Sequence, residues 1–185
     1  MAVIEELRGA QFTAGYNVNV KSMRLTIDPG VTRLRPFFVY VAIAAARSVV
    51  GLGLWYIGFE RRTIGLLSYY VWQPAKRAEG AIPVVFVHGI GVGVLPYVAL
   101  IARIRRVMLD APMCGAIFLP EMPYVSMTFT DKHTPTPTEI VRDMDDMLRI
   151  HGYSRAIFGG HSLGTSTHDF LFGYRSPAAQ PTSRS

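Results

Sequence analysis

The sequence has little cysteine and little charge. Its 185 residues include one cysteine, Cys114, so the chain can form no disulfide within itself, and no cysteine set points to a zinc site. Charged residues make up 17% of the chain, against about 25% in typical soluble proteins. Hydrophobic residues make up 50%. We therefore expect part of the chain to face something other than water.

The sequence also lacks the signs of a secreted or a nucleic-acid-binding protein. Its first ten residues, MAVIEELRGA, include acidic residues and no apolar segment, which excludes a secretory signal peptide. The net charge is +6, but the basic residues are spread in small groups, whereas a nucleic-acid site would gather them on one face. Three of these groups flank apolar runs. This position favours an anionic membrane surface as the partner, and we expect no binding of nucleic acid.

Residues 37–59 form a long apolar run, FFVYVAIAAARSVVGLGLWYIGF. Its length suffices to cross a hydrocarbon core, which needs about 20 residues. Arg47 lies near its middle, where an arginine costs roughly 2.5–3.5 kcal/mol, close to what the apolar side chains return. Three interpretations stay open: a marginal transmembrane helix, an interfacial helix whose arginine reaches the surface, and a buried element of the globular fold. The length of the run favours membrane association.

From about residue 81, short apolar runs alternate with helical patterns. The run IPVVFVHG predicts a strand buried on both faces, CGAIFLPE a second buried strand and RAIFGG a third strand. A helix is predicted after each strand, over LPYVALIARIRRVM, over residues 137–151 and from about residue 165. The second helix has Thr136 as N-cap and Glu139 as the other arm of a capping box. Its aspartates Asp143, Asp145 and Asp146 are predicted to lie on a solvated face.

The pentapeptide Gly160-His161-Ser162-Leu163-Gly164 matches the pattern G-x-S-x-G. This pattern is typical of a serine nucleophile on a sharp turn from a strand into a helix, and a strand and a helix are predicted on its two sides. Gly160 and Gly164 leave space where any side chain would collide. Ser162 is therefore the candidate catalytic residue, while the adjacent His161 is interpreted as structural.

An acyl-transfer site also needs two backbone N–H groups aimed at the developing oxyanion. Leu163 would supply one of them. The loop His88-Gly89-Ile90-Gly91 follows an earlier buried strand and stands where the second donor is expected. His88 is interpreted as the residue that orients this loop by hydrogen bonding. A dinucleotide-binding loop is the alternative, but the third glycine of G-x-G-x-x-G is missing.

The segment from about Ala81 to Tyr174 resembles the first half of an α/β-hydrolase domain. Its stretches VVFVHGIGVG, PEMPYVSM and GHSLGT together resemble fungal-type α/β hydrolases with an apolar N-terminal extension. The resemblance implies an α/β fold, namely a partial three-layer α/β hydrolase with a mostly parallel sheet. It implies Ser162 as the nucleophile, Leu163 as one oxyanion donor and Ile90 or Gly91 as the other. It also implies hydrolysis of an ester or lipid-like acyl substrate, with no metal and no cofactor.

The acid and the histidine that would complete a catalytic triad with Ser162 are not identified by this resemblance. In this fold the acid and the histidine of the triad follow the serine on later strands. After Ser162 the candidates are His168 and Asp169, which fall inside the helix that begins at the elbow and cannot reach the hydroxyl. We therefore expect a catalytically incomplete site. Such a chain is either a truncated serine hydrolase or a non-enzymatic, membrane-associated interaction protein built on part of the fold.

The expected organisation has four parts. Residues 1–35 form an N-terminal segment, residues 36–74 an apolar membrane-associated region, residues 80–174 the partial hydrolase domain and residues 175–185 a disordered tail. No clear run of strand patterns is seen before residue 80. The expected location is a membrane, either an intracellular one or one that the sequence does not identify.

Overall fold

The computed structural model describes residues 35–110, 114–128 and 133–165, together with Gly9, Gly15 and Asn19. The expected tail and nearly all of the expected N-terminal segment lie outside the described residues. His168 and Asp169 do so as well. The helix predicted after the elbow is described only at its start, where residues 163–165 are helical.

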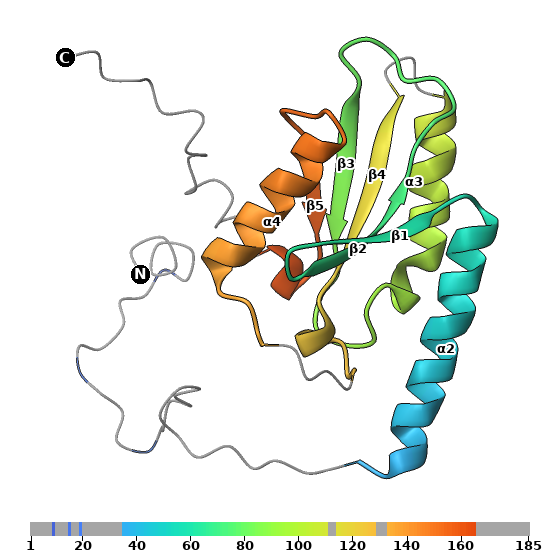
Figure 1. Ribbon diagram of the computed structural model, residues 1–185. Helices are drawn as coiled ribbons and strands as arrows, with labels where there is room; N and C mark the ends of the chain where they lie inside the picture. The colour runs from blue at the N-terminus through green and yellow to red at the C-terminus, as the bar shows by residue number, and fades with distance from the viewer. Residues whose placement is uncertain are drawn as a thin grey trace. The chain divides into compact units, whose positions relative to one another are not determined.

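A five-stranded mixed sheet forms the centre of the described fold, with the strand order β1-β2-β4-β3-β5 (Figure 1). The three predicted strands β3, β4 and β5 run parallel to one another, as expected, whereas β2 pairs antiparallel with both β1 and β4. Parallel order brings the carboxyl ends of β3, β4 and β5 to one edge of the sheet. The strands are β1 (Glu60–Ile64), β2 (Leu67–Trp72), β3 (Ile82–Val87), β4 (Cys114–Glu121) and β5 (Ile157–Gly160).

The hairpin of β1 and β2 corrects the sequence analysis, which placed residues 60–72 in the membrane-associated region and found no strands before residue 80. Almost every residue of β2 is buried, because β2 lies inside the sheet between β1 and β4 with helices on both faces. A short apolar run of this kind suits a core strand as well as a membrane-facing segment. The residues of β1 are mostly exposed, so their sequence carries no apolar alternation.

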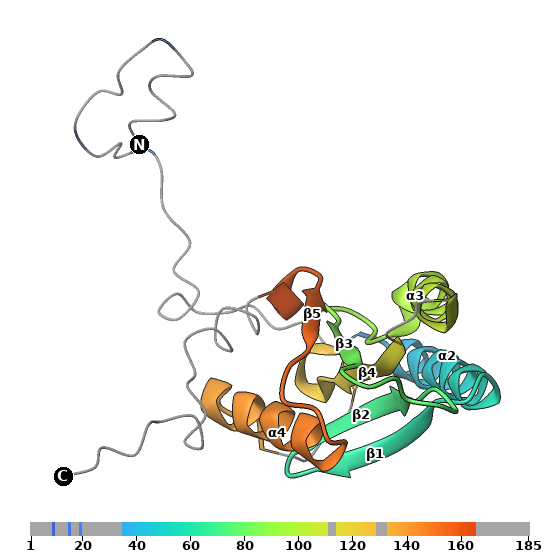
Figure 2. The ribbon, with the colours of Figure 1, turned by 90° about the horizontal axis from the view of Figure 1, so that it is seen from above.

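Helices cover both faces of the sheet and give the predicted three layers (Figure 2). Helix α4 (Pro137–Ile150) packs Met144 and Met147 on one face, and its predicted capping box of Thr136 and Glu139 is present. Helices α2 (Phe37–Tyr56) and α3 (Val98–Asp110) cover the other face. The prediction of a solvated Asp143 is wrong, since its side chain is buried and accepts a hydrogen bond from the backbone of the β1–β2 turn.

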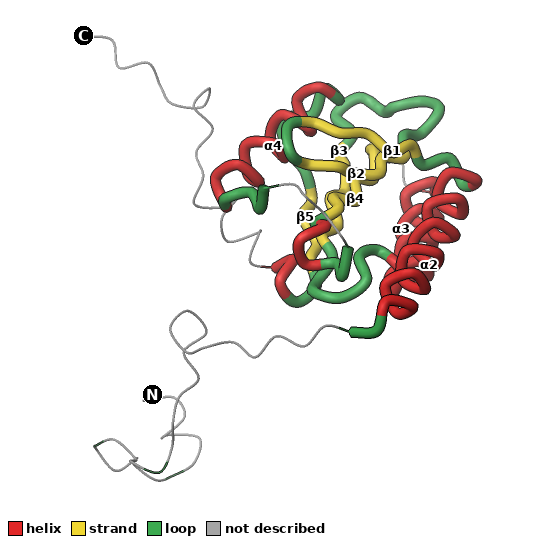
Figure 3. The backbone as a smooth tube through the Cα atoms, turned by 60° about the horizontal axis from the view of Figure 1, so that its bottom comes forward, coloured by secondary structure: helices red, strands yellow, loops and turns green. Residues whose placement is uncertain are grey.

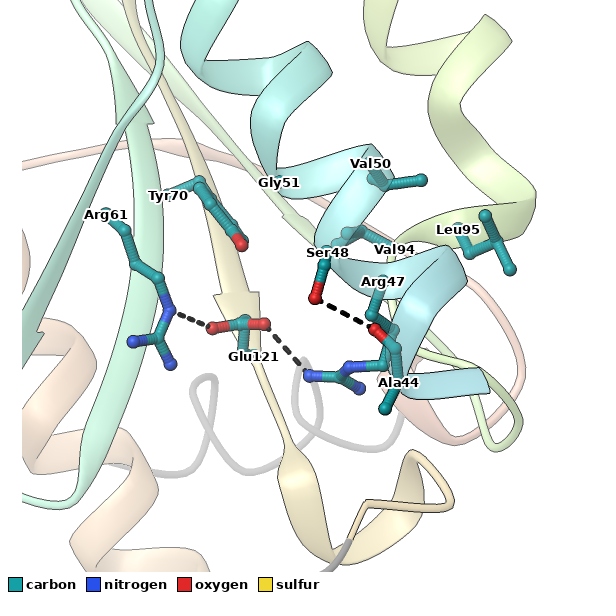
Figure 4. A pocket seen from close by; sticks show the side chains of 10 residues that line it. All are labelled: Ala44, Arg47, Ser48, Val50, Gly51, Arg61, Tyr70, Val94, Leu95 and Glu121. Atoms are coloured by element: carbon teal, nitrogen blue, oxygen red, sulfur yellow. Dashed lines mark hydrogen bonds and ion pairs between the residues drawn. The ribbon is translucent and has the colours of Figure 1, made fainter. Parts of the chain in front are cut away.

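Residues 37–56 of the apolar run form α2, which by length and composition could cross a membrane. Its second half packs Leu54 against the sheet. Arg47 points toward the sheet and pairs with Glu121 at the end of β4, with 3.1 Å between the Arg47 Nη2 and Glu121 Oε1 atoms (Figure 4). Arg61 of β1 pairs with the same carboxylate at 2.8 Å. Arg47 is therefore neutralised inside the protein, and little else of α2 is buried.

Candidate active site

The turn after β5 has the geometry that the G-x-S-x-G pattern predicts. Ser162 has a φ of 54°, one of two positive values among the described non-glycine residues, and its side chain is exposed. A left-handed conformation in a non-glycine residue costs of order 1–3 kcal/mol and is found mostly where function or a sharp turn requires it. Ser162 therefore lies on a sharp, strained turn, just past the carboxyl edge of the sheet.

The glycines on both sides of Ser162 make this turn possible. A Cβ atom on Gly160 would lie 2.6 Å from the carbonyl oxygen of Gly164. A Cβ atom on Gly164 would collide with the carbonyl oxygen of Val87 and lie 2.9 Å from that of His88. The turn is thus pressed against the end of β3, and both positions exclude any side chain, as the sequence analysis predicted.

The loop after β3 lies directly against this turn. A Cβ atom on Gly89 would lie 2.9 Å from the Cβ atom of Ser162 and 2.8 Å from the carbonyl oxygen of His161. The two motifs are more than seventy residues apart in the sequence and meet because β3 and β5 are paired neighbours in the sheet. The structure therefore brings together the predicted nucleophile and the predicted oxyanion loop.

The backbone N–H groups of Leu163 and Ile90, in the two segments that meet at Ser162, are among those with no hydrogen-bond partner in the described part of the chain. Gly91 differs, since its N–H donates to the carbonyl oxygen of Val125 at 2.9 Å. The sequence left Ile90 and Gly91 open as the second donor. The structure favours Ile90, because the hydrogen atom of the Gly91 amide is already in use.

His88 holds the loop in place. Its buried ring donates from Nδ1 to the carbonyl oxygen of Gly89 at 2.9 Å, and its Nε2 accepts from the N–H of Met122 at 3.1 Å. Since a carbonyl oxygen only accepts and an N–H only donates, both bonds require the neutral ring. The pKa of His88 is lowered, mainly because the ring is buried, and this also favours the neutral form. These two bonds tie the loop after β3 to the end of β4, in agreement with the hydrogen-bonding role predicted for His88.

Comparison with solved structures finds proteins of similar fold. The carboxylesterase CesB from Bacillus subtilis matches with a TM-score of 0.51 and 16% identity, over 72% of this chain and 44% of its own. The Aspergillus niger epoxide hydrolase matches with a TM-score of 0.49 and 14% identity, over 71% and 37% of the two chains. A putative epoxide hydrolase from Pseudomonas aeruginosa matches with a TM-score of 0.45 and 17% identity, over 62% of this chain and 36% of its own.

The chain has a partial α/β-hydrolase fold. It spans less than half the length of the solved structures it matches. Neither the family models nor the curated proteins that were compared with it give a match. At this level of identity the likeness establishes the fold and leaves the reaction to be argued from the site.

His161 belongs to the elbow of this α/β-hydrolase fold without contacting the serine hydroxyl. Its Nδ1 lies 2.8 Å from the hydroxyl of Tyr97, and the two rings pack 5.6 Å apart. Tyr97 was not singled out from the sequence, where it is one of several apolar positions at the start of a helix. This pair links the elbow to the segment before α3 and agrees with the structural role predicted for His161.

The described part of the α/β-hydrolase fold holds no base for Ser162. Among residues 35–110, 114–128 and 133–165, no side chain hydrogen-bonds its hydroxyl, and His88 is committed to its two backbone partners. The same residues contain no group of three side chains suited to hold a metal ion. What the site presents is an exposed serine hydroxyl and two backbone donors.

Proposed function

We propose that this chain carries the nucleophile and the oxyanion hole of a serine hydrolase that acts on an ester or a lipid-like acyl substrate. One observation carries the proposal: the left-handed conformation of Ser162 on a turn that lies against the Gly89 loop. The N–H groups of Leu163 and Ile90, which lack partners among the described residues, support it. The fold alone would not choose between an enzyme and a binding protein.

The proposed chemistry is acyl transfer. The Ser162 oxygen attacks the carbonyl carbon, its proton passes to a base, and the carbonyl oxygen becomes an oxyanion. The N–H groups of Leu163 and Ile90 then donate to this oxyanion, an interaction whose loss typically lowers kcat by about 10²–10³-fold. When the intermediate collapses, the ester C–O bond breaks, the alcohol leaves with the proton held by the base, and water later releases the acyl group from Ser162. A serine at its ordinary pKa is a weak nucleophile. Because none of the described residues supplies the base, the proposal covers the nucleophile and the oxyanion hole alone.

A fluorophosphonate probe tests this proposal, because such probes modify a serine that has an oxyanion hole and access to a base. We expect the 185-residue chain to be labelled slowly and added imidazole, as an external base, to accelerate the labelling. Ser162→Ala should abolish it. Ser154→Ala is the matched control, since Ser154 is another exposed serine, in the loop before β5, and its loss should change nothing.

Two results would redirect the proposal. Labelling that survives Ser162→Ala would remove Ser162 from the nucleophile position. Absence of labelling even with imidazole would favour the alternative, a non-enzymatic membrane-associated interaction protein. Fast labelling without imidazole would support the hydrolase and contradict the expected incompleteness.

The proposed setting is a membrane. The described residues include one helix that is long and apolar enough to span a bilayer, and most of its large side chains are exposed. A soluble core helix of this composition would be mostly buried, whereas a single buried residue, Leu54, is found in α2. An ester held in or near a bilayer is therefore the substrate class that we propose.

A further inference from the structure

The outer face of α2 is uncharged and apolar along its whole length. Arg47 is the only charged residue of the helix, and it points to the opposite side, toward Glu121 (Figure 4). Phe37 is 74% exposed and Trp55, at the other end, 71%. At 100° per residue the exposed side chains share one face, about 30 Å long for 20 residues. The large ones are Phe37, Phe38, Val41, Val49, Leu52, Trp55 and Tyr56.

The inner face of α2 is attached to the domain. Leu54 is buried with the sheet residues, and Val50 and Ile57 pack against the same cluster. The Arg47–Glu121 pair adds a contact whose disruption would leave the partly buried Arg47 without its counterpart, while Glu121 would keep Arg61. A helix surrounded by lipid would have to give up these contacts and expose Arg47. The attachment therefore favours a helix with one face on the protein and one face on lipid.

Helix α3 adds positive charge to the same surface. It lies beside α2 on one face of the sheet, and the two helices bury Leu54 and Ile101 in a common cluster, so both outer faces point away from the sheet (Figure 3). Arg103 and Arg106 are exposed on α3, on the side opposite to Ile101. We call the outer faces of both helices, with these two arginines and the apolar residues of α2, the α2–α3 surface.

We propose that the α2–α3 surface docks on an anionic lipid bilayer, with α2 lying in the plane of the interface rather than across it. The apolar side chains of α2 enter the boundary between headgroups and acyl chains, where aromatic residues such as Phe38 and Trp55 are favoured. Arg103 and Arg106 reach anionic headgroups, which attract basic side chains close to the surface.

Charge complementarity distinguishes the bilayer from a second copy of the chain. Two copies paired through this surface would bring the arginines of one α3 close to those of the other, and like charges at an interface are unfavourable. The chain as a whole carries a formal net charge of +6, which adds to this repulsion and to the attraction toward anionic lipid. An anionic bilayer satisfies both the apolar and the basic part of the surface.

Docking has a consequence for the candidate oxyanion loop, and this consequence rests on the proposed function. The loop that runs from Gly89 to α3 contacts α2, because a Cβ atom on Gly93 would lie 3.0 Å from Nη1 of Arg47. The candidate oxyanion loop is therefore joined to the docking helix. Arg47 lies on the inner side of α2, so docking of the outer face would leave this contact in place and keep the candidate oxyanion loop next to the helix that binds the bilayer.

Vesicle flotation of the full chain tests the docking. We expect co-flotation with vesicles of phosphatidylcholine and phosphatidylserine, and binding at least about ten-fold weaker for Leu52→Asp. Ile150→Asp is the matched control, because Ile150 is equally exposed but lies on α4, across the sheet. Arg103→Gln and Arg106→Gln should each weaken binding to anionic vesicles about five-fold and leave binding to pure phosphatidylcholine unchanged.

The depth of α2 separates an in-plane helix from a spanning one. A polarity-sensitive fluorophore is placed at Val41→Cys or Leu52→Cys in a Cys114→Ser background, and its quenching by lipids with spin labels at known depths is measured. These positions are eleven residues apart, about 16 Å along a helix. An in-plane helix gives both the same shallow depth. Depths that differ by about that distance would overturn the proposal in favour of a spanning helix.

Other results would also overturn it. Leu52→Asp that floats like the wild type would exclude α2 as the docking face. Sedimentation could instead show a dimer that dissociates in Leu52→Asp and does not bind vesicles. That result would mean that a second copy of the chain, and not a bilayer, covers the α2–α3 surface. Ser162→Ala should float like the wild type, so failed labelling with intact flotation would count against the hydrolase proposal alone, and failed flotation with intact labelling against docking alone.

Discussion

At the scale of single residues, strain and close contact are concentrated around Ser162. The left-handed conformation of Ser162 is unfavourable by itself and is held by the fit of its neighbours. Gly164 has the least room of these neighbours, because a Cβ atom there would meet the backbone carbonyls of Val87 and His88. These atoms belong to the end of β3 and cannot move without disturbing its pairing with β5.

Gly164→Ala should therefore lower the free energy of unfolding by about 2–3 kcal/mol, as expected for an added methyl group in a closed space. Urea unfolding followed by far-ultraviolet circular dichroism measures this change. Gly53→Ala is the control: Gly53 lies within α2, and a Cβ atom there meets nothing within 4 Å. It should stabilise the chain by about 0.5–1 kcal/mol, because alanine suits a helix better than glycine. Equal effects at both positions would contradict the close contact at the elbow.

At the scale of elements, Asp143 connects the β1–β2 hairpin to α4. Its buried carboxylate accepts a hydrogen bond from the N–H of Leu66 at 2.8 Å. A Cβ atom on Gly65 would lie 2.6 Å from the same carboxylate oxygens, which is too close. The positive φ of Gly65 and the absence of a side chain both allow this approach. Asp143, which the sequence pattern placed on a solvated helix face, thus holds the turn between β1 and β2.

Asp143→Ala should lower the free energy of unfolding by about 1.5–3 kcal/mol, since it removes a hydrogen bond to a charged group and leaves a backbone N–H unpaired. Asp146→Ala, on the same helix and partly exposed, should change it by no more than about 0.5 kcal/mol. Urea unfolding of the two variants in parallel measures the difference. Similar losses for both would mean that the hairpin does not depend on the Asp143 contact.

Most of the elements that could be predicted are those whose burial leaves a simple pattern. Buried strands read as continuous apolar runs, which is why β3 and β4 were predicted, and the N-cap of α4 is set by local hydrogen bonds. The strand β5 has a similar apolar run although it lies at the edge of the sheet and is partly exposed. The strand β1 could not be found this way, because its side chains are mostly exposed. The strand β2 has a run too short to separate a core strand from a membrane segment, and only its partners in the sheet decide.

At the scale of the whole molecule, the site depends on contacts between distant segments, and these were predictable only in part. The elbow and the oxyanion loop carry recognisable motifs, and the order of strands and helices placed them at one edge. Other contacts depend on how the loops pack and leave no pattern in the sequence. Examples are the hydrogen bond from the Gly91 N–H to the Val125 carbonyl oxygen and the contact of Tyr97 with His161. The pairing of Arg47 with Glu121 likewise could not be derived from the apolar run that contains Arg47.

Two partly or fully buried histidines make the stability of the whole fold depend on pH. His88 is bound between the oxyanion loop and β4, and His151 lies near Tyr69 of β2 and Gln73. Burial is the main cause that lowers the pKa of each below its usual value of 6.5. In the folded state both rings therefore resist protonation at a pH where the unfolded chain accepts protons.

The free energy of unfolding should therefore fall as the pH decreases through about 6.5, because the unfolded state binds more protons, and it should stop falling once the lowered pKa values are passed. His88→Gln retains a side chain that can donate and accept but does not titrate, so its stability should decline less steeply over this range. Urea midpoints between about pH 7.5 and 5.5 measure the two slopes, and a constant packing cost of the variant does not affect them. Equal slopes, or a wild-type stability that rises on acidification, would show that the neutral His88 ring does not hold the oxyanion loop to β4 as its two hydrogen bonds indicate.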